Sequence, residues 1–297
     1  MTPVSHGKPC AGNLHARFEE GDSAQAEPRR SALLHKSRIG LALGGGGARG
    51  IAHLGVWQKL RELGIEFHCI AGTSIGAIAG AIIAAGRVDA ALKWCAESDW
   101  KKLPKLFMET HFTSKALTKG ARAEKLLAEL VGAKTFAELT TPYAAIATDL
   151  NTGERVVIRD GDLLSAVRAS MSIPGVFCPV ERDGRILIDG QLVDPIPVAA
   201  CKAMGADKVI AVDINPPDAI GSAKPFSKMN VFDILVGTIG IFNREITRRE
   251  LAEHKPDLLI RPEVGNVLAL DFRNASRLVE IGRQAVDVDV AEKAAAL

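Results

Sequence analysis

Residues 70–80, IAGTSIGAIAG, hold Ser74 between Gly72 and Gly76. A hydrolase that carries its nucleophilic serine on a sharp turn between a strand and a helix needs this G-x-S-x-G spacing, because the two glycines let the backbone bend and the hydroxyl stand out. The pattern also arises by chance in a chain with 28 glycines. Its surroundings therefore decide whether Ser74 is a nucleophile or an ordinary residue of a glycine-rich turn.

The neighbouring segments alternate between short apolar runs and amphipathic stretches. Residues 39–43 (IGLAL) and 66–71 (EFHCIA) are typical of buried strands, whereas residues 51–63 and 75–85 carry apolar side chains at helical spacing. The order strand, glycine loop, helix, strand, serine turn, helix predicts a three-layer α/β fold with a mainly parallel central sheet flanked by helices. Catalysis in such a sheet is expected at the carboxyl ends of the strands.

The rest of the chain divides into three predicted parts. Residues 1–37 mix charge, proline and glycine without periodicity, which predicts a disordered tail. Residues 38–215 are predicted to form the catalytic domain, and residues 216–297 a C-terminal helical extension. Within the domain, further helices are expected at 88–98, 121–132 and 162–174, and further strands at 143–150, 154–161, 185–188 and 207–214.

Composition excludes several classes of protein. Lys and Arg number 37 against 35 Asp and Glu, so the chain lacks the basic excess of a dedicated nucleic-acid binder. The five cysteines are scattered without metal-ligand spacing, which favours a reduced, cytoplasmic compartment and no metal site. No apolar run reaches the ~18 residues of a membrane span. We expect a cytoplasmic protein whose only membrane contact is peripheral, at the inner membrane surface.

The glycine loop GGGGARG, residues 44–50, permits two interpretations. Gly45, Gly47 and Gly50 form a G-x-G-x-x-G pattern, which in a dinucleotide site requires an acidic residue at the end of the next strand. Glu66 has the right sequence distance, but it begins that strand instead of ending it. The alternative is an oxyanion hole, in which successive glycine N–H groups face a developing negative charge. We favour the oxyanion hole.

Two residues compete for the role of base. His254 alone gives the chain order serine, aspartate, histidine of the α/β-hydrolases, but its charged setting, ELAEHKPD, is typical of a helix end. Asp189 ends the apolar strand RILI and precedes Gly190, which predicts a place at the catalytic edge of the sheet. Burial raises the pKa of a carboxyl group and would make it a better base. From this stretch alone, a simple turn aspartate is an equal alternative.

Taken together, GGGGARG, GTSIG and the later DG resemble the patatin-like phospholipase family, especially its small bacterial members. The resemblance covers residues 39–198, includes RASMSIPGVFCPV and DGQLVDPIPV, and extends into the strand at 208–214. It implies a lipid acyl hydrolase, acting on phospholipids or lysophospholipids with a serine–aspartate dyad and no metal or cofactor. The residues implied are Ser74 as nucleophile, Asp189 as base, Gly45, Gly46 and Gly47 as oxyanion hole, and Arg49, Gly50, Gly72, Gly76 and Gly190 in support.

Two positions depart from the family pattern. Gly44 stands where plant members have aspartate, and Gln191 replaces the usual glycine or alanine after the catalytic aspartate. Two other functions stay open: an acyltransferase of a related fold, which usually employs a histidine base, and a regulatory protein without activity.

Two stretches combine apolar and basic residues outside the predicted sheet. They are residues 100–112 (WKKLPKLFMETHF) and 228–249, in which Val231, Phe232, Leu235, Ile239 and Phe242 recur at helical spacing before three arginines. Such a helix could lie on a lipid surface. The alternative is that these faces pack on the core or on a second subunit.

Overall fold

The computed structural model describes residues 37–97, 120–215, 227, 229, 231–265, 267 and 271–297 of the 297-residue chain. The chain divides into two units, residues 1–36 and 37–297, and all described residues belong to the second. The predicted tail up to residue 36 and the stretch 100–112 lie outside the described residues, so those expectations stay predictions.

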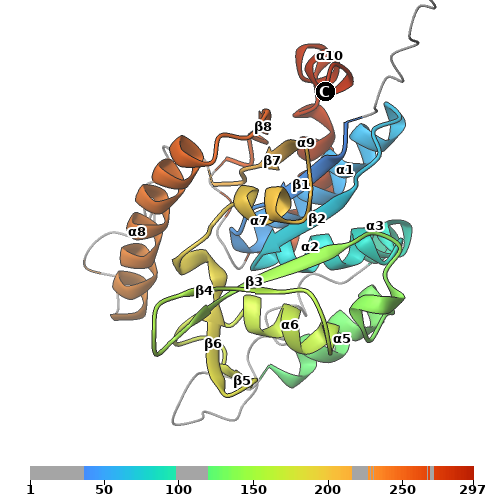
Figure 1. Cartoon of the computed structure of the whole chain (residues 1–297). Coiled ribbons are helices and arrows are strands. Elements are labelled where there is room, and N and C mark those ends of the chain that lie inside the picture. The colour runs from blue at the N-terminus through green and yellow to red at the C-terminus, as the bar shows by residue number, and fades with distance from the viewer. Residues whose placement is uncertain are drawn as a thin grey trace, which may run out of the picture. The chain divides into compact units, whose positions relative to one another are not determined.

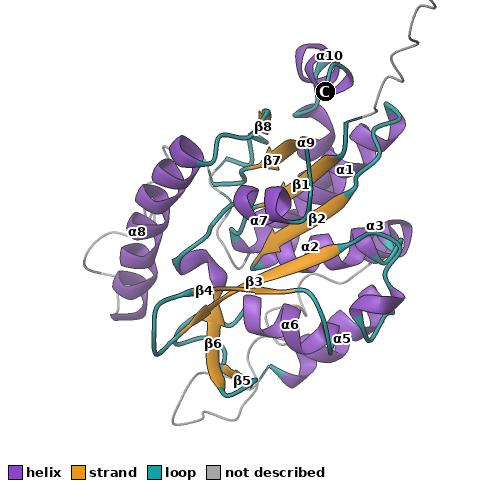
Figure 2. Cartoon of the chain, viewed as in Figure 1, coloured by secondary structure: helices purple, strands orange, loops and turns teal. Residues whose placement is uncertain are grey.

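The second unit is built on one eight-stranded sheet with helices on both faces (Figures 1 and 2). Its strands are β1 (Ile39–Leu43), β2 (Cys69–Thr73), β3 (Tyr143–Asp149), β4 (Arg155–Ile158), β5 (Val180–Arg182), β6 (Arg185–Asp189), β7 (Lys208–Val212) and β8 (Leu258–Ile260). The α-helices are α1 (Ala52–Glu62), α2 (Ile75–Ala84), α3 (Val88–Glu97), α5 (Ala121–Val131), α6 (Leu163–Ser170), α7 (Val198–Ala203), α8 (Val231–Glu253), α9 (Ala275–Gln284) and α10 (Val288–Ala295). The 3₁₀ turns are η1 (Gly47–Ile51), η2 (Phe136–Glu138), η3 (Gly190–Leu192) and η5 (Phe272–Asn274).

The sheet has a parallel part and an antiparallel part. Strands β3, β2, β1, β7 and β8 pair in that order and are all parallel. Strands β4 and β6 both pair antiparallel with β3, and β5 pairs antiparallel with β6. This agrees with the predicted mainly parallel sheet. The strand-helix-strand order of the first half accounts for it, since parallel neighbours need such crossover connections.

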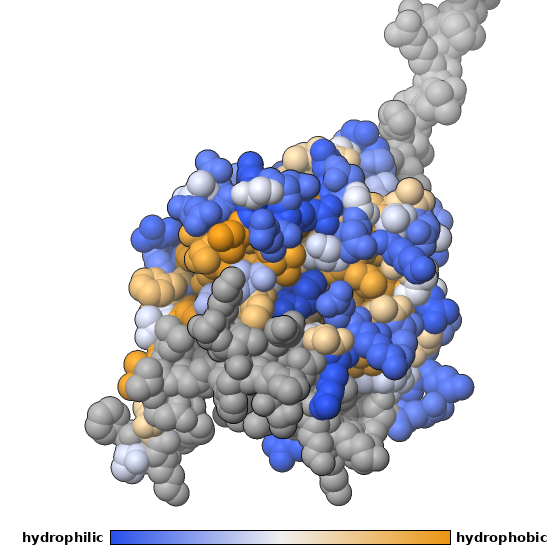
Figure 3. Space-filling view, turned by 90° about the horizontal axis from the view of Figure 1, so that it is seen from below, coloured by the Kyte–Doolittle hydropathy of each residue, from blue (hydrophilic) through white to orange (hydrophobic). Residues whose placement is uncertain are grey.

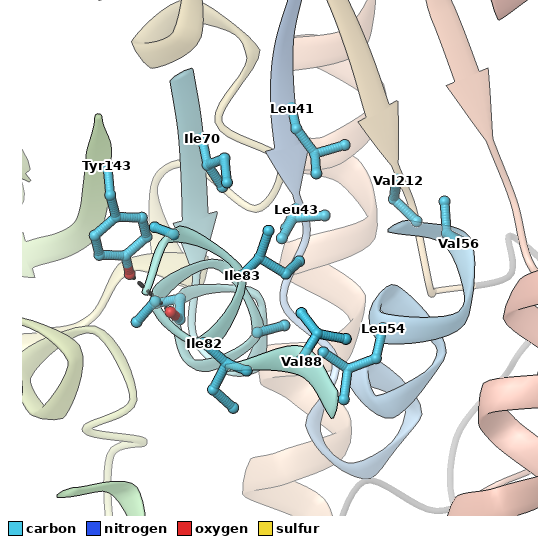
Figure 4. Close-up of a cluster of buried hydrophobic side chains, with 14 of the residues drawn as sticks. Leu41, Leu43, Leu54, Val56, Ile70, Ile82, Ile83, Val88, Tyr143 and Val212 are labelled. Carbon is cyan, nitrogen blue, oxygen red and sulfur yellow. Dashed lines mark hydrogen bonds between the residues drawn. The ribbon is translucent and has the colours of Figure 1, made fainter. Parts of the chain in front are cut away.

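Alternate residues of the strands face two different hydrophobic clusters, which makes the unit three-layered. Leu41 and Leu43 of β1 belong to the larger cluster, which α1, α2 and α9 cover (Figure 4). Ala42, between them, belongs to the cluster beneath α7, where most sheet residues are as small as alanine. A small-residue surface lets α7 lie close to the strands. On the larger face, the Tyr143 hydroxyl donates a hydrogen bond of 2.7 Å to the Ala77 carbonyl.

The helices α1 and α9 pack against each other at glycines. A Cβ atom on Gly55 would collide with the carbonyl oxygen of Val279, and one on Gly282 would collide with the carbonyl oxygen of Ala52. Backbone therefore touches backbone at both points. Helix α1 follows the glycine loop directly, so α9 supports the position of that loop from outside.

Residues after 216 are not only helical. β8 lies in this segment and joins the sheet edge by pairing parallel with β7. It was not predicted because it has only three residues, between Pro256 and Pro262. Strand β2 also begins later than expected, at Cys69 instead of residue 66. Among the described residues, no helix combines the length and the apolar character that crossing a bilayer requires.

Candidate active site

Ser74 lies between β2 and α2 in a strained backbone conformation. Its φ of 56° falls in the left-handed region, which side-chain-bearing residues rarely adopt. The predicted glycines make the turn possible: a Cβ on Gly72 would collide with the carbonyl of Gly76, and one on Gly76 with the carbonyl of Leu43. The neighbouring Ser170 hydroxyl accepts a 2.9 Å hydrogen bond from the Ser74 N–H. The turn is thus held by backbone contacts on several sides.

Asp189 lies directly against this serine. The Ser74 hydroxyl donates a 2.6 Å hydrogen bond to Oδ2 of Asp189, and the Gln191 N–H donates one of 2.8 Å to Oδ1. Both side chains are buried. Burial raises the pKa of the Asp189 carboxyl from 3.8 to about 6, although the hydrogen bonds from Ser74 and Gln191 favour its charged form. A carboxylate with this pKa and this contact can accept the hydroxyl proton.

The way in which these two residues meet differs from the expectation. Asp189 was expected at the carboxyl edge of a parallel sheet, but its strand β6 runs antiparallel to β3. The ends of β2 and β6 pair with consecutive residues of β3: Thr73 of β2 pairs with Ile146, and Asp189 of β6 pairs with Ala147. Strand β4 occupies one edge of β3 along residues 145–148. Both β2 and β6 must therefore lie along the other edge of β3. Their carboxyl ends therefore face each other, and this contact joins serine to aspartate.

The glycine loop is anchored by its first residues. The N–H of Gly44 donates to the Val212 carbonyl at 3.0 Å, and the N–H of Gly45 donates to the Pro195 carbonyl at 3.1 Å. Within the described residues, the N–H groups of Gly46 and Gly47 have no hydrogen-bond acceptor. Gly47 lines the same pocket as Ser74. Of the three glycines predicted to form the oxyanion hole, Gly46 and Gly47 therefore each have an N–H group without an acceptor among the described residues. The N–H of Gly45 already donates to Pro195.

Side chains hold the carbonyl groups of the same loop. Asn215 Nδ2 donates to the Gly45 carbonyl at 2.6 Å, and Arg49 Nε donates to the Gly46 carbonyl at 3.0 Å. His53 Nε2 lies 2.7 Å from the Gly44 carbonyl. Burial lowers the pKa of His53 to about 4, so its ring is neutral at pH 7 and its Nε2–H is the donor. These bonds turn the loop carbonyls away and leave N–H groups for another partner.

The remaining predicted site residues also lie in this region. A Cβ on Gly190 would collide with the Ile146 carbonyl beside Asp189, and one on Gly50 would collide with the side chain of Ile75. His254, by contrast, lies near the end of α8 with Nε2 3.8 Å from carboxylates of Glu250 and Glu253. No hydrogen bond joins it to Ser74 or Asp189.

An apolar pocket of about 130 Å³ opens beside the serine. Of the lining residues that the structure describes, Ser74 alone has a hydroxyl, and the described walls come from η1, α1, α2, α3, α5, the segment after α6, and η5. The aliphatic and aromatic lining residues are Ile51, Leu54, Ile75, Ile78, Ile82, Trp94, Leu126, Leu127, Leu130, Met171, Ile173, Phe177 and Phe272. This described lining suits a hydrocarbon chain, since it contains no charged side chain.

A family model described as patatin-like phospholipase matches residues 41–202, more than half of the chain. The chain belongs to the patatin-like phospholipase family. It is 43% identical over 185 residues to an uncharacterized NTE family protein of Mycobacterium tuberculosis, covering 61% of this chain and 50% of that protein. A second such protein of M. tuberculosis is 30% identical over 317 residues, covering 96% of this chain and 50% of its own length.

Another relative in the family is the patatin-like phospholipase domain-containing protein 7 of Rattus norvegicus. It is 34% identical over 195 residues, which cover 64% of this chain and 14% of the rat protein. Among solved structures, VipD from Legionella pneumophila matches with a TM-score of 0.45 and 14% identity, over 86% of this chain and 67% of that one. The chain spans about half the length of the first two relatives.

The sequence did not predict the contacts that several further residues make in this site. Ser170, Asn215 and His53 contact the serine turn or the glycine loop, but none of them stands in a spacing that indicates catalysis. Ser170 lies in the stretch RASMSIPGVFCPV that carried part of the resemblance, so the family pattern was its one signal. The contact of Asn215 depends on β7 lying beside β1, which only the fold shows.

Proposed function

We propose that the protein hydrolyses carboxylic ester bonds of lipids, with Ser74 as nucleophile and Asp189 as base. The observation that carries this proposal is the 2.6 Å hydrogen bond between the two side chains at the end of an apolar pocket. Membership of the patatin-like phospholipase family supports the substrate class, phospholipids or lysophospholipids.

In the first half of the reaction, Ser74 Oγ attacks the acyl carbonyl carbon while its proton passes to Asp189 Oδ2. The carbonyl oxygen becomes an oxyanion, and we assign its hydrogen bonds to the N–H groups of Gly46 and Gly47, with Gly45 anchoring the loop. The tetrahedral intermediate then collapses. The alkoxide leaving group takes the proton from Asp189, and an acyl-serine ester remains.

In the second half, water replaces the alcohol. Asp189 accepts a proton from the water as its oxygen attacks the acyl-serine carbonyl, and the same N–H groups hold the second oxyanion. Collapse releases the fatty acid and returns the proton to Ser74. The acyl chain occupies the apolar pocket throughout, where burial of each CH₂ group contributes about 0.8 kcal/mol. No step requires a metal or a cofactor.

A fluorophosphonate probe and a short soluble ester test this proposal together. The probe should label wild type at Ser74, and Ser74→Ala should abolish both labelling and ester hydrolysis, because the nucleophilic oxygen is lost. A side-chain-only change at this position keeps the backbone contacts of the turn, so the melting temperature should stay close to that of wild type. Hydrolysis by Ser74→Ala above a tenth of the wild-type rate contradicts the assignment and would leave the non-catalytic alternative in place.

We also propose peripheral contact with the inner surface of the cytoplasmic membrane through α8. Ile241 and Phe242 are 65% and 61% exposed on this helix. Arg248 and Arg249 follow on the same face and share one carboxylate, Glu245, so the three charges sum to one positive charge. Exposed apolar residues also interrupt the hydrophilic surface in the view from below (Figure 3). Apolar residues beside a basic end are typical of helices that lie at a lipid surface.

Vesicle co-sedimentation tests the contact of α8 with lipid. Ile241→Ser/Phe242→Ser should lose most of its binding to vesicles of phosphatidylcholine with phosphatidylglycerol, while hydrolysis of a short soluble ester stays unchanged. Val288→Ser, which removes an exposed apolar side chain of α10, is the matched control and should bind as wild type does. A change of oligomeric state in the double variant, with vesicle binding retained, would show that this face contacts a second subunit instead.

A further inference from the structure

The segment 190–195, which contains η3 and ends shortly before α7, is hydrogen-bonded to three parts of the proposed site. It begins directly after Asp189. Near its end, the Asp194 carbonyl accepts a 2.8 Å hydrogen bond from Oγ1 of Thr73, the residue before the nucleophile. The Pro195 carbonyl accepts the hydrogen bond from the Gly45 N–H. The base, the residue before the nucleophile and the glycine loop are therefore all hydrogen-bonded to one short piece of chain.

The Asp194 carboxylate anchors this segment from inside. The residue has no exposed surface, and its Oδ2 accepts a 3.0 Å hydrogen bond from Nη1 of Arg155 on β4. Its own N–H donates to the Gly190 carbonyl at 2.9 Å, which closes the segment into a turn. The other carboxylate oxygen, Oδ1, has no hydrogen-bond partner among the described residues. Among the described residues, Arg155 is thus the one charged partner that is hydrogen-bonded to this side chain.

The neighbours of this pair are also charged. Glu250 of α8 and His254, the residue directly after α8, lie near enough to influence the Asp194 carboxyl, Glu250 disfavouring its charge and His254 favouring it. Burial is the larger effect and raises the pKa of Asp194 to about 6, despite the favourable charge of Arg155. The Arg155 side chain is 37% exposed, but the Asp194 carboxyl is fully buried, and burying a carboxyl group costs free energy that a partly exposed partner offsets only in part. This pair is therefore a costly way to obtain stability alone.

We propose that Asp194 and Arg155 are positioning residues for the reaction at Ser74, because their contact sets the 190–195 segment and, through it, the base, the nucleophile and the glycine loop. The inference rests on the proposed function. Neither side chain touches the reacting atoms. Both act through backbone bonds of the segment to Thr73 and Gly45. Small displacements of reacting groups are costly: a misplacement of about 1 Å can reduce a rate about 10²-fold.

The test compares kinetic constants on a short soluble ester for four variants. Asp194→Asn and Arg155→Gln should each lower kcat about 10²-fold. KM should stay within about twofold of wild type, because the apolar pocket is untouched. Arg155→Lys keeps a positive charge near Asp194 and should recover a large part of the kcat that Arg155→Gln loses. Arg159→Gln, an exposed arginine directly after β4, is the matched control and should behave as wild type.

The outcomes separate positioning from stability and from the proposed function. If kcat of folded Asp194→Asn and Arg155→Gln equals that of wild type, or if Arg155→Lys is no better than Arg155→Gln, the positioning role is wrong. Should Asp194→Asn fail to fold, the two variants of Arg155, whose side chain is 37% exposed, decide the question. Ser74→Ala is measured in parallel: activity that survives there contradicts the proposed function, whereas normal Arg155 variants contradict only the positioning.

Discussion

The serine turn and the aspartate turn reach the same point of the sheet in different physical ways. At the serine turn the cost lies in the backbone, since Ser74 has a φ of 56° and is surrounded by glycines without room for a Cβ. At the aspartate turn the backbone of Asp189 is relaxed, with φ −50° and ψ 128°. There the cost is electrostatic, because a carboxyl group is buried and its pKa rises to about 6.

Different interactions therefore stabilise the two halves of the site. A strained turn persists only where contacts with surrounding atoms hold it in place. The stability of the serine turn should therefore depend on packing and hardly on pH. The effect of a buried carboxyl group on stability and activity depends on its protonation and hardly on small changes in the shape of its surroundings. Substitutions that add volume should therefore damage the serine turn, and changes of charge or pH should act on the aspartate turn.

The largest effect is expected where volume is added to the serine turn. In Gly76→Ala, the new Cβ would collide with the backbone carbonyl of Leu43, which cannot rotate away. Overpacking of a rigid site typically lowers the free energy of unfolding by about 1–3 kcal/mol, and occasionally by more, so we expect little folded protein. Gly240→Ala on α8, where a Cβ meets open space, is the control and should melt at or slightly above the wild-type temperature, because alanine favours a helix more than glycine does. Similar melting temperatures for the two variants would show that the turn is softer than its contacts imply.

Asp189→Asn should separate activity from stability. The amide cannot accept the serine proton, so kcat should fall about 10³-fold. Since the folded-state pKa of Asp189 lies above its unfolded value of 3.8, the native protein binds more protons between pH 4 and 6. The contribution of this carboxyl to stability therefore decreases as pH rises through that range, whereas the wild-type rate should increase with a midpoint near pH 6.

Two titrations check this opposition. The unfolding free energy of wild type, measured relative to Asp189→Asn, should decline from pH 4 to 6 and level off above, while kcat/KM rises. A relative stability that instead increases with pH would mean that Asp189 ionises readily in the folded protein, and a base with an ordinary pKa would replace the one described.

The smallest effect is expected from His254→Ala. This side chain lies at the end of α8, near Glu250 and Glu253, without a bond to either turn. Surface changes of this kind alter free energies by at most about 0.5 kcal/mol, so kcat and the melting temperature should stay close to wild type. A severe loss of kcat would identify a serine–aspartate–histidine arrangement and remove the distinction between the two turns.

The serine turn and the aspartate turn also differ in how far the sequence could predict them. The serine turn, the glycine loop and the flanking helices were predicted because each depends on residues close together in the chain, such as Gly72 and Gly76. The direction of β6 was not, since a five-residue strand has the same composition whichever way it runs. The contact of Asp194 with Arg155 joins residues from β4 and the segment after β6, so it too depends on tertiary pairing that leaves no local signal.

The close contact of α1 with α9 has a consequence for how the protein is made. Every residue in the proposed reaction, from the glycine loop to Asp189, leaves the ribosome before β8 and α9 do. Until then Gly55 has no Val279 to pack against, and the sheet lacks β8 at its edge. The nascent chain therefore carries a full set of reactive groups on an incomplete core, with apolar surface exposed to neighbouring chains or chaperones. Activity against lipids should appear only once translation has passed α9.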